Sequence, residues 1–454
     1  MRYKEYKKVD LPWIEEIPSH WEVNNFKKFV DMYTGNSIPD NEKNNYIYTE
    51  NSRPYISTKD ISKDNNYVNY NNGMCIKIDN LRFKVAKKDS TLVCIEGGSG
   101  GEKVAYVIKD VSFVNKLCCI KSSCEIINDK FIYYFVKSNL FKYQYYLNVT
   151  GDRNGVSLQK IRYFQILIPP KEEQEQIARF LDWKINEIDR IINLKTKELD
   201  NLEKLIESKI EEALLLNNKA QENINYEDAL KDIPTIRIKN IFTLRNERNL
   251  LSEDEIELLS LYTKLGVLKN KDIEYKSGNK NTTVLNYKIV KENDIVVNIM
   301  LCWMGAIGIS KYDGVISPAY DVYIPDLKLV NPLYYHYFFR SNLFKNELYK
   351  NGKGIVLMKW RVYSDKFMNI RVPLFTLKQQ DLILKQIENI KEKFKKNSQN
   401  LRLQIKNLKQ LKQSLISDVV TGKIDVRNIT IPDYDKADDI EDNTVLEENF
   451  EEEV

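Results

Sequence analysis

An internal repeat is the feature of this 454-residue sequence that most limits its possible folds. The run SNLFK at residues 138–142 recurs at residues 341–345, and Ile-Pro at 168–169 recurs as Val-Pro at 372–373. Gln174 similarly matches Gln379. Because these anchors keep their order and a nearly constant offset, the sequence predicts two copies of one unit about 204 residues long.

The first part of each unit is mixed in pattern and rich in Tyr, Asn, Lys and Gly. Short apolar runs at residues 90–95, 103–108 and 294–299 are bounded by Asn, Asp and Gly, which is typical of strands and turns. The segment around each SNLFK run predicts a helix with aromatic residues on one face. We therefore expect a compact α/β-type globule in each unit.

The second part of each unit has apolar residues at a seven-residue spacing, which predicts coiled-coil helices. The first helix is expected to begin after Pro169-Pro170 and to reach about residue 217, and the second to span about 377–421 and end at Gly422. Because a lone helix would expose its apolar seam, we expect the two to pair antiparallel, with the globules at opposite ends of a stiff rod. The predicted fold class is α+β with a pseudo-two-fold internal repeat. The expected seam residues are Ile185, Ile192, Leu199, Ile206, Phe394, Leu401, Leu408 and Leu415.

Several kinds of chemistry are excluded by the residues present. Only two histidines occur, His20 and His336, so a histidine-rich metal site is impossible. The six cysteines form no C-x-x-C pair and are expected to be reduced and buried, with adjacent Cys118 and Cys119 facing opposite sides of a strand. No GxxxxGK[ST] loop, GxGxxG fingerprint or acidic-Pro-Pro-aromatic motif is present. We therefore predict no catalytic residues, no metal and no cofactor in this chain.

The distribution of charge favours a nucleic-acid partner. The whole chain is +4, but residues 433–454 hold eleven acidic residues and one lysine, so this end is −10 and the rest is +14. The acidic end is expected to be a disordered tail. Basic residues elsewhere alternate with Tyr, Asn, Gln and Gly, types that contact phosphates and base edges. The candidate DNA-binding residues are Ser99, Lys103, Arg153, Asn154, Lys160, Lys350, Lys353, Lys359 and Arg361.

These candidates lie in or near three glycine-rich loops, at residues 97–101, 150–155 and 350–354, and a basic-aromatic cluster at 359–361. Each segment has an alternative interpretation. The first loop is equally well a long hairpin turn, the next two are otherwise solvated loops, and Trp360 on its own is more typical of a core residue.

No secretory signal is expected, since no apolar segment follows the first ten residues. The longest apolar stretch, residues 295–309, is shorter than the roughly 20 residues that a membrane span needs. It is better explained by two buried strands with a turn at Met304-Gly305. The protein is expected to be soluble and cytoplasmic, with no membrane partner.

Four features resemble the specificity (S) subunit of Type I restriction–modification systems. Residues 12–23, PWIEEIPSHWEV, resemble the opening motif W-x-G-E-I-P-x-H-W-E-V, with Glu15 in place of the usual glycine. Residues 168–177 resemble the start of the central conserved helix, and residues 407–427, ending in TGKIDVR, resemble the distal helix and its end. The globule–helix–globule–helix repeat is the fourth feature. The second helix departs from the pattern because Pro373-Leu374-Phe375 lacks the double proline.

The resemblance implies a non-catalytic subunit that gives a restriction–modification enzyme its DNA sequence specificity. Each globule would be a target recognition domain for one half of a bipartite double-stranded DNA site. The helices would set the spacing and dock two modification (methyltransferase) subunits, which bind S-adenosylmethionine and methylate adenine at N6. Two restriction subunits would use ATP and Mg²⁺ for translocation and cleavage.

Three alternatives remain: the specificity subunit of a related Type II system, a coiled-coil scaffold that does not bind DNA, and an enzyme that uses His20 or His336. The expected domain division places the N-terminal segment and first target recognition domain at 1–168, and the central helix at 169–220. A linker and the second target recognition domain follow at 221–373, the distal helix at 374–427 and the acidic tail at 428–454.

Overall fold

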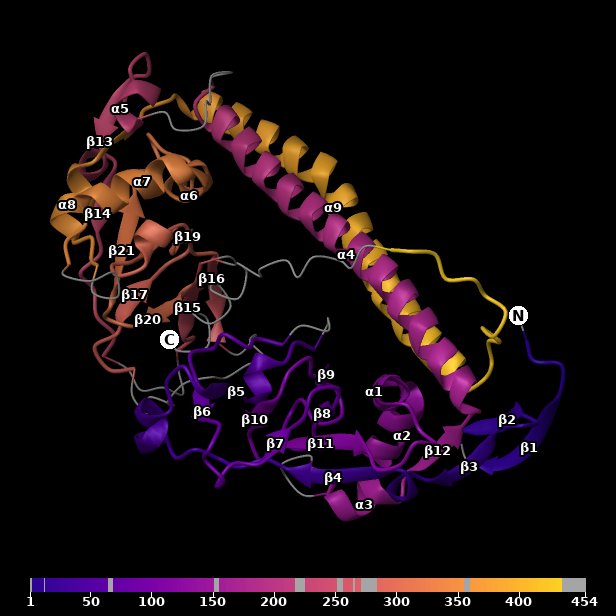
Figure 1. The fold of residues 1–454 in the computed structure, drawn as a ribbon. Helices are drawn as coiled ribbons and strands as arrows, with labels where there is room; N and C mark the ends of the chain where they lie inside the picture. The colour runs from indigo at the N-terminus through magenta and orange to yellow at the C-terminus, as the bar shows by residue number, and fades with distance from the viewer. Residues whose placement is uncertain are drawn as a thin grey trace. The chain divides into compact units, whose positions relative to one another are not determined.

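The chain folds into two compact units that each combine a mixed α/β globule with parts of two long helices. Of the described residues, unit 1 comprises those in 2–197 and 402–434, and unit 2 comprises those in Glu198–Leu401. Figure 1 shows the computed structural model. The structure describes residues 2–11, 13–63, 68–150, 155–216, 225–250, 256–263, 266–270, 284–354 and 360–434.

Two four-stranded sheets and three short helices form the globule of unit 1. One sheet has the order β4-β11-β8-β9 and the other the order β6-β5-β10-β7. A hairpin of β1 and β2 precedes them, and β3 pairs antiparallel with β12, so the start and the end of the globule lie together. The strands are β1 (Tyr6–Leu11), β2 (Ile14–Pro18), β3 (Glu22–Asn25), β4 (Val30–Thr34), β5 (Ser52–Ile56), β6 (Cys75–Lys77), β7 (Val85–Ala86), β8 (Thr91–Cys94), β9 (Val104–Tyr106), β10 (Val111–Phe113), β11 (Leu117–Ser122) and β12 (Gln165–Ile168), and the helices are α1 (Asp129–Lys137), α2 (Asn139–Leu147) and α3 (Leu158–Arg162).

The sheet that contains β11 is buried on both faces. Cys118 belongs to the apolar cluster that includes α1, whereas Cys119 belongs to the cluster formed with strands of the other sheet. Neighbouring residues of a strand point to opposite faces, so the sequence-based expectation for these two cysteines is confirmed. Burial raises the pKa of both thiols, which keeps them protonated.

Unit 2 repeats the plan of unit 1. Its main sheet has the order β14-β21-β18-β19, which matches β4-β11-β8-β9 element by element, and β13 pairs with β22 as β3 does with β12. Its strands are β13 (Thr235–Arg237), β14 (Phe242–Leu244), β15 (Leu259–Tyr262), β16 (Gly266–Lys269), β17 (Lys288–Val290), β18 (Ile295–Asn298), β19 (Ile307–Ile309), β20 (Gly314–Ile316), β21 (Tyr320–Pro325) and β22 (Arg371–Pro373), and its helices are α5 (Tyr226–Ala229), α6 (Pro332–Phe339), α7 (Asn342–Asn351) and α8 (Ser364–Asn369).

The apolar stretch at 295–309 forms β18 and β19, as predicted, joined by the short 3₁₀ helix η7 (Cys302–Met304). Gly305 has a φ of 93°, a left-handed conformation that glycine adopts without strain. No helix of the described residues is long and apolar enough to cross a membrane.

The SNLFK run recurs because it begins a helix with one buried face in both units. The Ser138 hydroxyl accepts a hydrogen bond from the backbone N–H of Phe141 at the start of α2, and Ser341 does the same for Phe344 at the start of α7. Each serine therefore caps its helix. Both phenylalanines are fully buried, so a single pentapeptide supplies a cap and a core residue.

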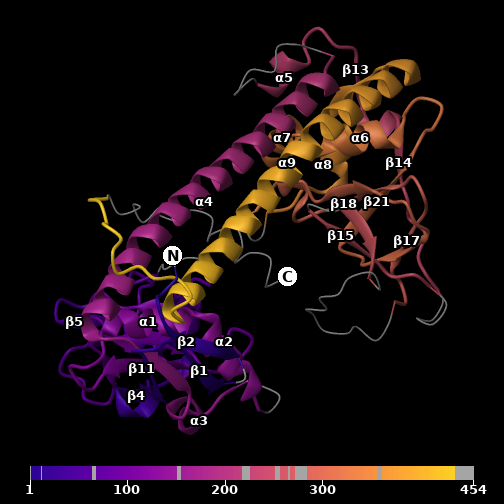
Figure 2. The same ribbon diagram turned by 90° about the vertical axis from the view of Figure 1, so that its right-hand side faces the viewer.

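The long helices α4 (Lys171–Leu214) and α9 (Leu377–Val420) each have 44 residues and lie side by side in both views (Figure 1 and Figure 2). In unit 1 the first half of α4 meets the last half of α9, where Lys412 pairs with Asp189. In unit 2 the end of α4 meets the start of α9, where Leu214 and Ile383 share one apolar cluster. The pairing is antiparallel, as predicted, and α9 ends at Val420, two residues before Gly422, whose φ is 75°.

The seam residues differ in burial along the helices. Ile185 and Leu401 are buried, and the other six predicted seam residues are partly exposed. Leu411, which follows the same apolar spacing, is 54% exposed. The seam residues therefore make only incomplete apolar contact between α4 and α9.

A buried glutamine at the start of each long helix ties it to its globule. The Gln174 amide donates to the carbonyls of Ile126 and Pro169 and accepts from the backbone N–H of Asn128. Gln380 makes the corresponding three bonds with Leu329, Phe375 and Asn331. The structural counterpart of Gln174 is therefore Gln380, and the sequence match with Gln379 was one residue off. Gln379 instead bonds Thr376, just before α9 begins.

The chain after α9 returns along unit 1. Gln176 on α4 donates to the carbonyls of Val426 and Ile429, and Ile429 and Ile431 pack against the core of the unit. The tail predicted from residue 428 thus begins with a packed segment. Residues 435–454, which carry most of its acidic charge, lie outside the described residues.

Candidate nucleic-acid interface

The loop between β8 and β9 is a hairpin turn packed against α2. Gly101 has a φ of 73°, and a Cβ at this position would lie 2.8 Å from the ring of Tyr145. Glu102 forms an ion pair with Lys142 at 3.2 Å and accepts a hydrogen bond from Tyr146. Two predicted DNA-binding residues, Ser99 and Lys103, lie in this turn.

Neither of these residues is fully exposed. The carbonyl of Ser99 accepts from the backbone N–H groups of Glu102 and Lys103, at 3.1 and 3.3 Å. The Lys103 ammonium donates to the carbonyl of Thr58 at 2.9 Å, which leaves two of its three N–H groups for another partner. The structure supports the hairpin-turn interpretation and leaves a DNA contact by Lys103 available.

The second loop of unit 1 is adjacent to the first. The backbone N–H of Val156, just after the loop at 150–155, donates to the carbonyl of Ile95 at 3.1 Å. Arg153 and Asn154 of this loop lie outside the described residues. Lys160 follows on α3, where its ammonium donates to the carbonyl of Asn148 at 3.0 Å.

Unit 2 joins its own two loops in the same way. The backbone N–H of Val362 donates to the carbonyl of Ile299 at 2.9 Å, which is the counterpart of the bond between Val156 and Ile95. We call these adjoining loops the paired-loop surface, described residues 95–103 with 150 and 155–156 in unit 1, and 299–306 with 350–354 and 360–362 in unit 2. The fold thus brings Ser99 and Lys103 to this surface in unit 1, and Lys350, Lys353 and Arg361 to it in unit 2.

Exposed cations and aromatic rings mark the paired-loop surface of unit 2. Lys350, Lys353 and Arg361 are exposed, whereas Lys359 lies outside the described residues. The indole of Trp360 stacks on Tyr349 with ring centroids 5.1 Å apart, and its Nε1 donates to the Tyr349 carbonyl at 3.2 Å. Trp360 is only partly buried, so it supports the loop without entering the core.

Sequence reasoning did not single out the other aromatic and apolar residues of this surface. Trp303 contacts Tyr349 with ring centroids 5.5 Å apart, and Met304 is 45% exposed. The sequence had identified residues 304 and 305 only as a turn. The available signal was the position of Tyr349 directly before Lys350, at the same place in the repeat as Tyr146.

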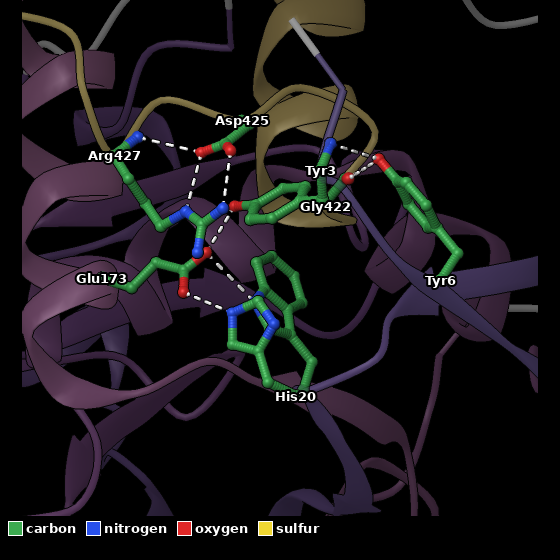
Figure 3. A network of polar contacts seen from close by, with 8 residues as sticks. Tyr3, Tyr6, His20, Glu173, Gly422, Asp425 and Arg427 are labelled. Atoms are coloured by element: carbon green, nitrogen blue, oxygen red, sulfur yellow. Dashed lines mark hydrogen bonds and ion pairs between the residues drawn. The ribbon is translucent and has the colours of Figure 1, made fainter.

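A second polar site connects the beginning and the end of the chain to α4 (Figure 3). The Glu173 carboxylate accepts hydrogen bonds from Tyr3 and from Trp21 Nε1, and lies 2.8 Å from His20 Nε2. Burial and the bond to Glu173 raise the pKa of the Tyr3 hydroxyl far above its usual range. The buried carboxylate thus holds three side chains from the first 21 residues.

The segment after α9 joins the same network. Arg427 pairs with Asp425 at 2.8 Å, which lowers the pKa of that carboxyl, and its guanidinium lies 4.6 Å from the ring centroid of Tyr3. Tyr6 donates to the carbonyl of Gly422 at 2.9 Å. The opening motif, the start of the central helix and the TGKIDVR segment therefore meet at one place (Figure 3).

The histidines have structural partners. His20 belongs to the network around Glu173, and His336 Nδ1 accepts from the backbone N–H of Ile309 at 3.2 Å. Burial lowers the pKa of His336 to about 3. Among the described residues, no group of three or more His, Cys, Asp or Glu is arranged to hold a metal ion.

Comparison with known proteins assigns the family. Residues 18–204 match the family model described as Type I restriction modification DNA specificity domain. Residues 18–204 therefore form a DNA specificity domain of the Type I restriction–modification family. Specificity subunits are the non-catalytic members of their complexes. The matched residues include His20, Trp21 and Glu173 of the polar network.

Three solved structures are similar to this specificity subunit. One, described as "Structural basis underlying complex assembly and conformational transition of the type I R-M system", is 12% identical, covers 90% of this chain and 99% of that chain, and has a TM-score of 0.60. This likeness shows a shared fold. The HsdS subunit from Thermoanaerobacter tengcongensis is 13% identical with coverages of 90% and 98% and a TM-score of 0.42. The S subunit from M. genitalium is 14% identical with coverages of 94% and 100% and a TM-score of 0.35.

Proposed function

We propose that each globule of this specificity subunit is a target recognition domain that reads one half of a bipartite double-stranded DNA site. The observation that carries the proposal is the repeated paired-loop surface, closed by the bond from Val156 to Ile95 in unit 1 and from Val362 to Ile299 in unit 2. Equivalent surfaces on duplicated globules suit two half-sites. Different side chains on them suit different sequences, because base edges are distinguished by the groups that face them.

The candidate contacts are those predicted from the sequence. In unit 1 they are Ser99, Lys103, Arg153, Asn154 and Lys160, and in unit 2 they are Lys350, Lys353, Lys359 and Arg361. Exposure in the described residues supports Lys350, Lys353 and Arg361 most strongly. Lys103 and Lys160 each donate one hydrogen bond to a backbone carbonyl, and therefore keep donors for phosphate oxygens.

The paired helices would set the distance between the half-sites and dock two modification subunits. Their length supports this role, because 44 residues at 1.5 Å each give a helix about 66 Å long. Their unused apolar surface supports it as well, since Leu194, Leu403 and Leu411 are each more than half exposed. Apolar residues on an otherwise polar helix are available for further helix packing.

The expected partners supply the chemistry. Two modification subunits would bind S-adenosylmethionine and methylate adenine, and two restriction subunits would use ATP and Mg²⁺. A related Type II system, in which one partner fuses nuclease and methylase, is the second candidate, and the neighbouring genes would distinguish the two. The complex would act in the cytoplasm, where the host DNA lies.

The functional segments we propose are residues 1–168, 169–220, 221–373, 374–427 and 428–454. They differ from the two compact units because the helices continue through both units. The exchange of residues 24–168 for those of another specificity subunit should therefore change only the first half-site.

Methylation sequencing of the host genome, with and without this gene, tests the function. We expect one bipartite adenine-methylated motif to disappear when the gene is removed. After the exchange of residues 24–168, one half of that motif should change. A methylome unaffected by loss of the gene would overturn the proposal, and a change in both halves would refute the modular assignment. Salt-dependent DNA binding would exclude the scaffold alternative, which has no DNA role, because phosphate contacts weaken steeply with salt.

A further inference from the structure

Two cations face each other across the paired-loop surface of unit 2. Lys353 and Arg361 form an antiparallel bridge in which each backbone N–H donates to the carbonyl of the other, at 2.9 and 3.0 Å. We propose that this pair is a clamp for a DNA backbone phosphate, a contact that positions the DNA without reading its sequence. The inference rests on the proposed DNA-binding function of unit 2.

The arrangement is electrostatically unfavourable without a ligand. In a pair that exchanges both hydrogen bonds the Cα atoms are about 5.5 Å apart, and like charges directly opposite each other destabilise a strand pair. Both side chains are exposed, and neither forms an ion pair with any described residue. A bound anion would remove the repulsion.

The surrounding residues hold the bridge in place. The Trp360 indole, next to Arg361, stacks on Tyr349 and donates to its carbonyl at 3.2 Å. A Cβ on Gly352, next to Lys353, would lie 2.1 Å from Trp360 Nε1, so only glycine leaves room for this packing. The bond from Val362 to Ile299 fixes the other side of Arg361. A pre-organised pair loses little conformational freedom when it binds.

The carbonyl end of helix α7 explains why a cation lies at Lys350, but it does not explain the other cations of this surface. Lys350 lies in the last turn of α7, where the carbonyl end of a helix favours a cation. Lys353 lies two residues beyond that helix, and Arg361 comes from the other side of the bridge. The helix end therefore explains Lys350 without a ligand but does not explain Arg361.

A phosphate suits the pair better than a base edge does. A guanidinium can hold two phosphate oxygens at once, and an ammonium beside it can hold a third or bridge to the next phosphate. A guanine edge offers two acceptors to one cation and would leave the second cation without a partner. Two adjacent cations therefore match a charged, sequence-independent group.

The equivalent bridge of unit 1 carries no charge. Thr150 and Gly155 form it, and the Thr150 N–H donates to the Gly155 carbonyl at 3.0 Å. Among the described residues, the cation clamp is thus confined to unit 2. It would give the second half-site a larger share of the salt-sensitive binding.

The test compares Lys353→Gln/Arg361→Gln with the charge-matched control Lys328→Gln/Lys366→Gln, which removes two other exposed lysines of unit 2. Each specificity subunit is assembled with its methyltransferase, and binding to target and single-mismatch DNA is measured across a salt series. Loss of two phosphate contacts should lower the slope of log K against log salt by about 1.8 and weaken binding about tenfold at ~0.1 M salt. The ratio of target to mismatch affinity should stay unchanged.

A third variant checks the electrostatic argument. Arg361→Glu places a carboxylate opposite Lys353, so Tm should stay level or rise while DNA binding weakens. The clamp is overturned if the double variant matches the lysine control, or if it changes the preference among second half-sites, which would make the pair a base reader. If the unaltered complex does not distinguish its target from random DNA, the proposed function fails instead.

Discussion

The Lys412 ammonium lies 2.6 Å from one carboxylate oxygen of Asp189 and 2.8 Å from the other, and it joins α9 to α4 within unit 1. Their side chains are 7% and 19% exposed. A charge that is left unpaired in such a place is costly. The pair also shows which residues of the antiparallel helices lie opposite each other.

We expect Lys412→Met to lower the free energy of unfolding of the subunit by about 2 kcal/mol, because Asp189 would keep a partly buried charge without its main partner. Chemical denaturation measures the change. Lys423→Met, which breaks the longer and more exposed pair with Asp418, should cost less than about 1 kcal/mol. Equal losses in the two variants would contradict the role of the Lys412 pair.

Lys137 should make unit 1 more stable as the pH rises from 7 to about 8.5. Burial, with nearby Lys412, lowers the pKa of Lys137 to about 7 from 10.5. Between these values the unfolded chain holds a proton that the folded chain has released, so the free energy of unfolding increases with pH. Lys137→Met should remove about 1 kcal/mol of that increase.

Urea denaturation at pH 7 and 8.5 measures this pH dependence as the difference between the variant and the parent protein. Lys4→Met, which alters an exposed lysine of the same unit, should follow the parent. A parent and a Lys137→Met variant with parallel pH profiles would refute the prediction.

The buried glutamines at the helix starts should contribute equally in the two units. Gln174→Ala and Gln380→Ala each leave two carbonyls and one backbone N–H without partners, at a cost of about 2 to 3 kcal/mol. Gln379→Ala, which removes two hydrogen bonds from Thr376 at the exposed helix start, should cost about 1 kcal/mol or less. If Gln379→Ala and Gln380→Ala lowered the free energy of unfolding equally, Gln379 would again be the counterpart of Gln174, as the sequence suggested.

Shortening of both helices by one heptad should move the half-sites closer. In the register set by Asp189 and Lys412, deletion of residues 195–201 and 400–406 removes facing segments. Seven residues shorten a helix by about 10 Å, close to the rise of three base pairs. Methylome sequencing should then show a shorter spacer or no methylation at the original sites. Unchanged methylation at those sites would defeat the spacer model.

Periodic and local features of this fold were predictable from the sequence. The heptad spacing gave the position and pairing of α4 and α9, because an apolar stripe on a long helix needs a partner. The SNLFK runs revealed the duplication, since Ser138 and Ser341 act on atoms only three residues away. Contacts between residues so close in the sequence can be predicted from the order of the residues alone.

Features that depend on tertiary pairing were not predictable. The choice of Gln380 over Gln379 depends on which side chain faces the loop at Leu329. The opposition of Lys353 and Arg361 depends on a bridge between residues on either side of an intervening loop. Residue type identified Lys353 and Arg361 as candidates, but only the bridge shows that they lie opposite each other.

The composition of unit 1 has a consequence for protein synthesis. Unit 2 is contiguous over Glu198–Leu401, whereas unit 1 needs the described residues 402–434 in addition to the first 197 residues. At roughly 5–20 residues per second, the ribosome adds the stretch from Lys197 to Arg427 in roughly 10 to 50 s. Unit 1 is therefore begun first but completed only after the whole of unit 2 has been made, and until then the network around Glu173 lacks Asp425 and Arg427.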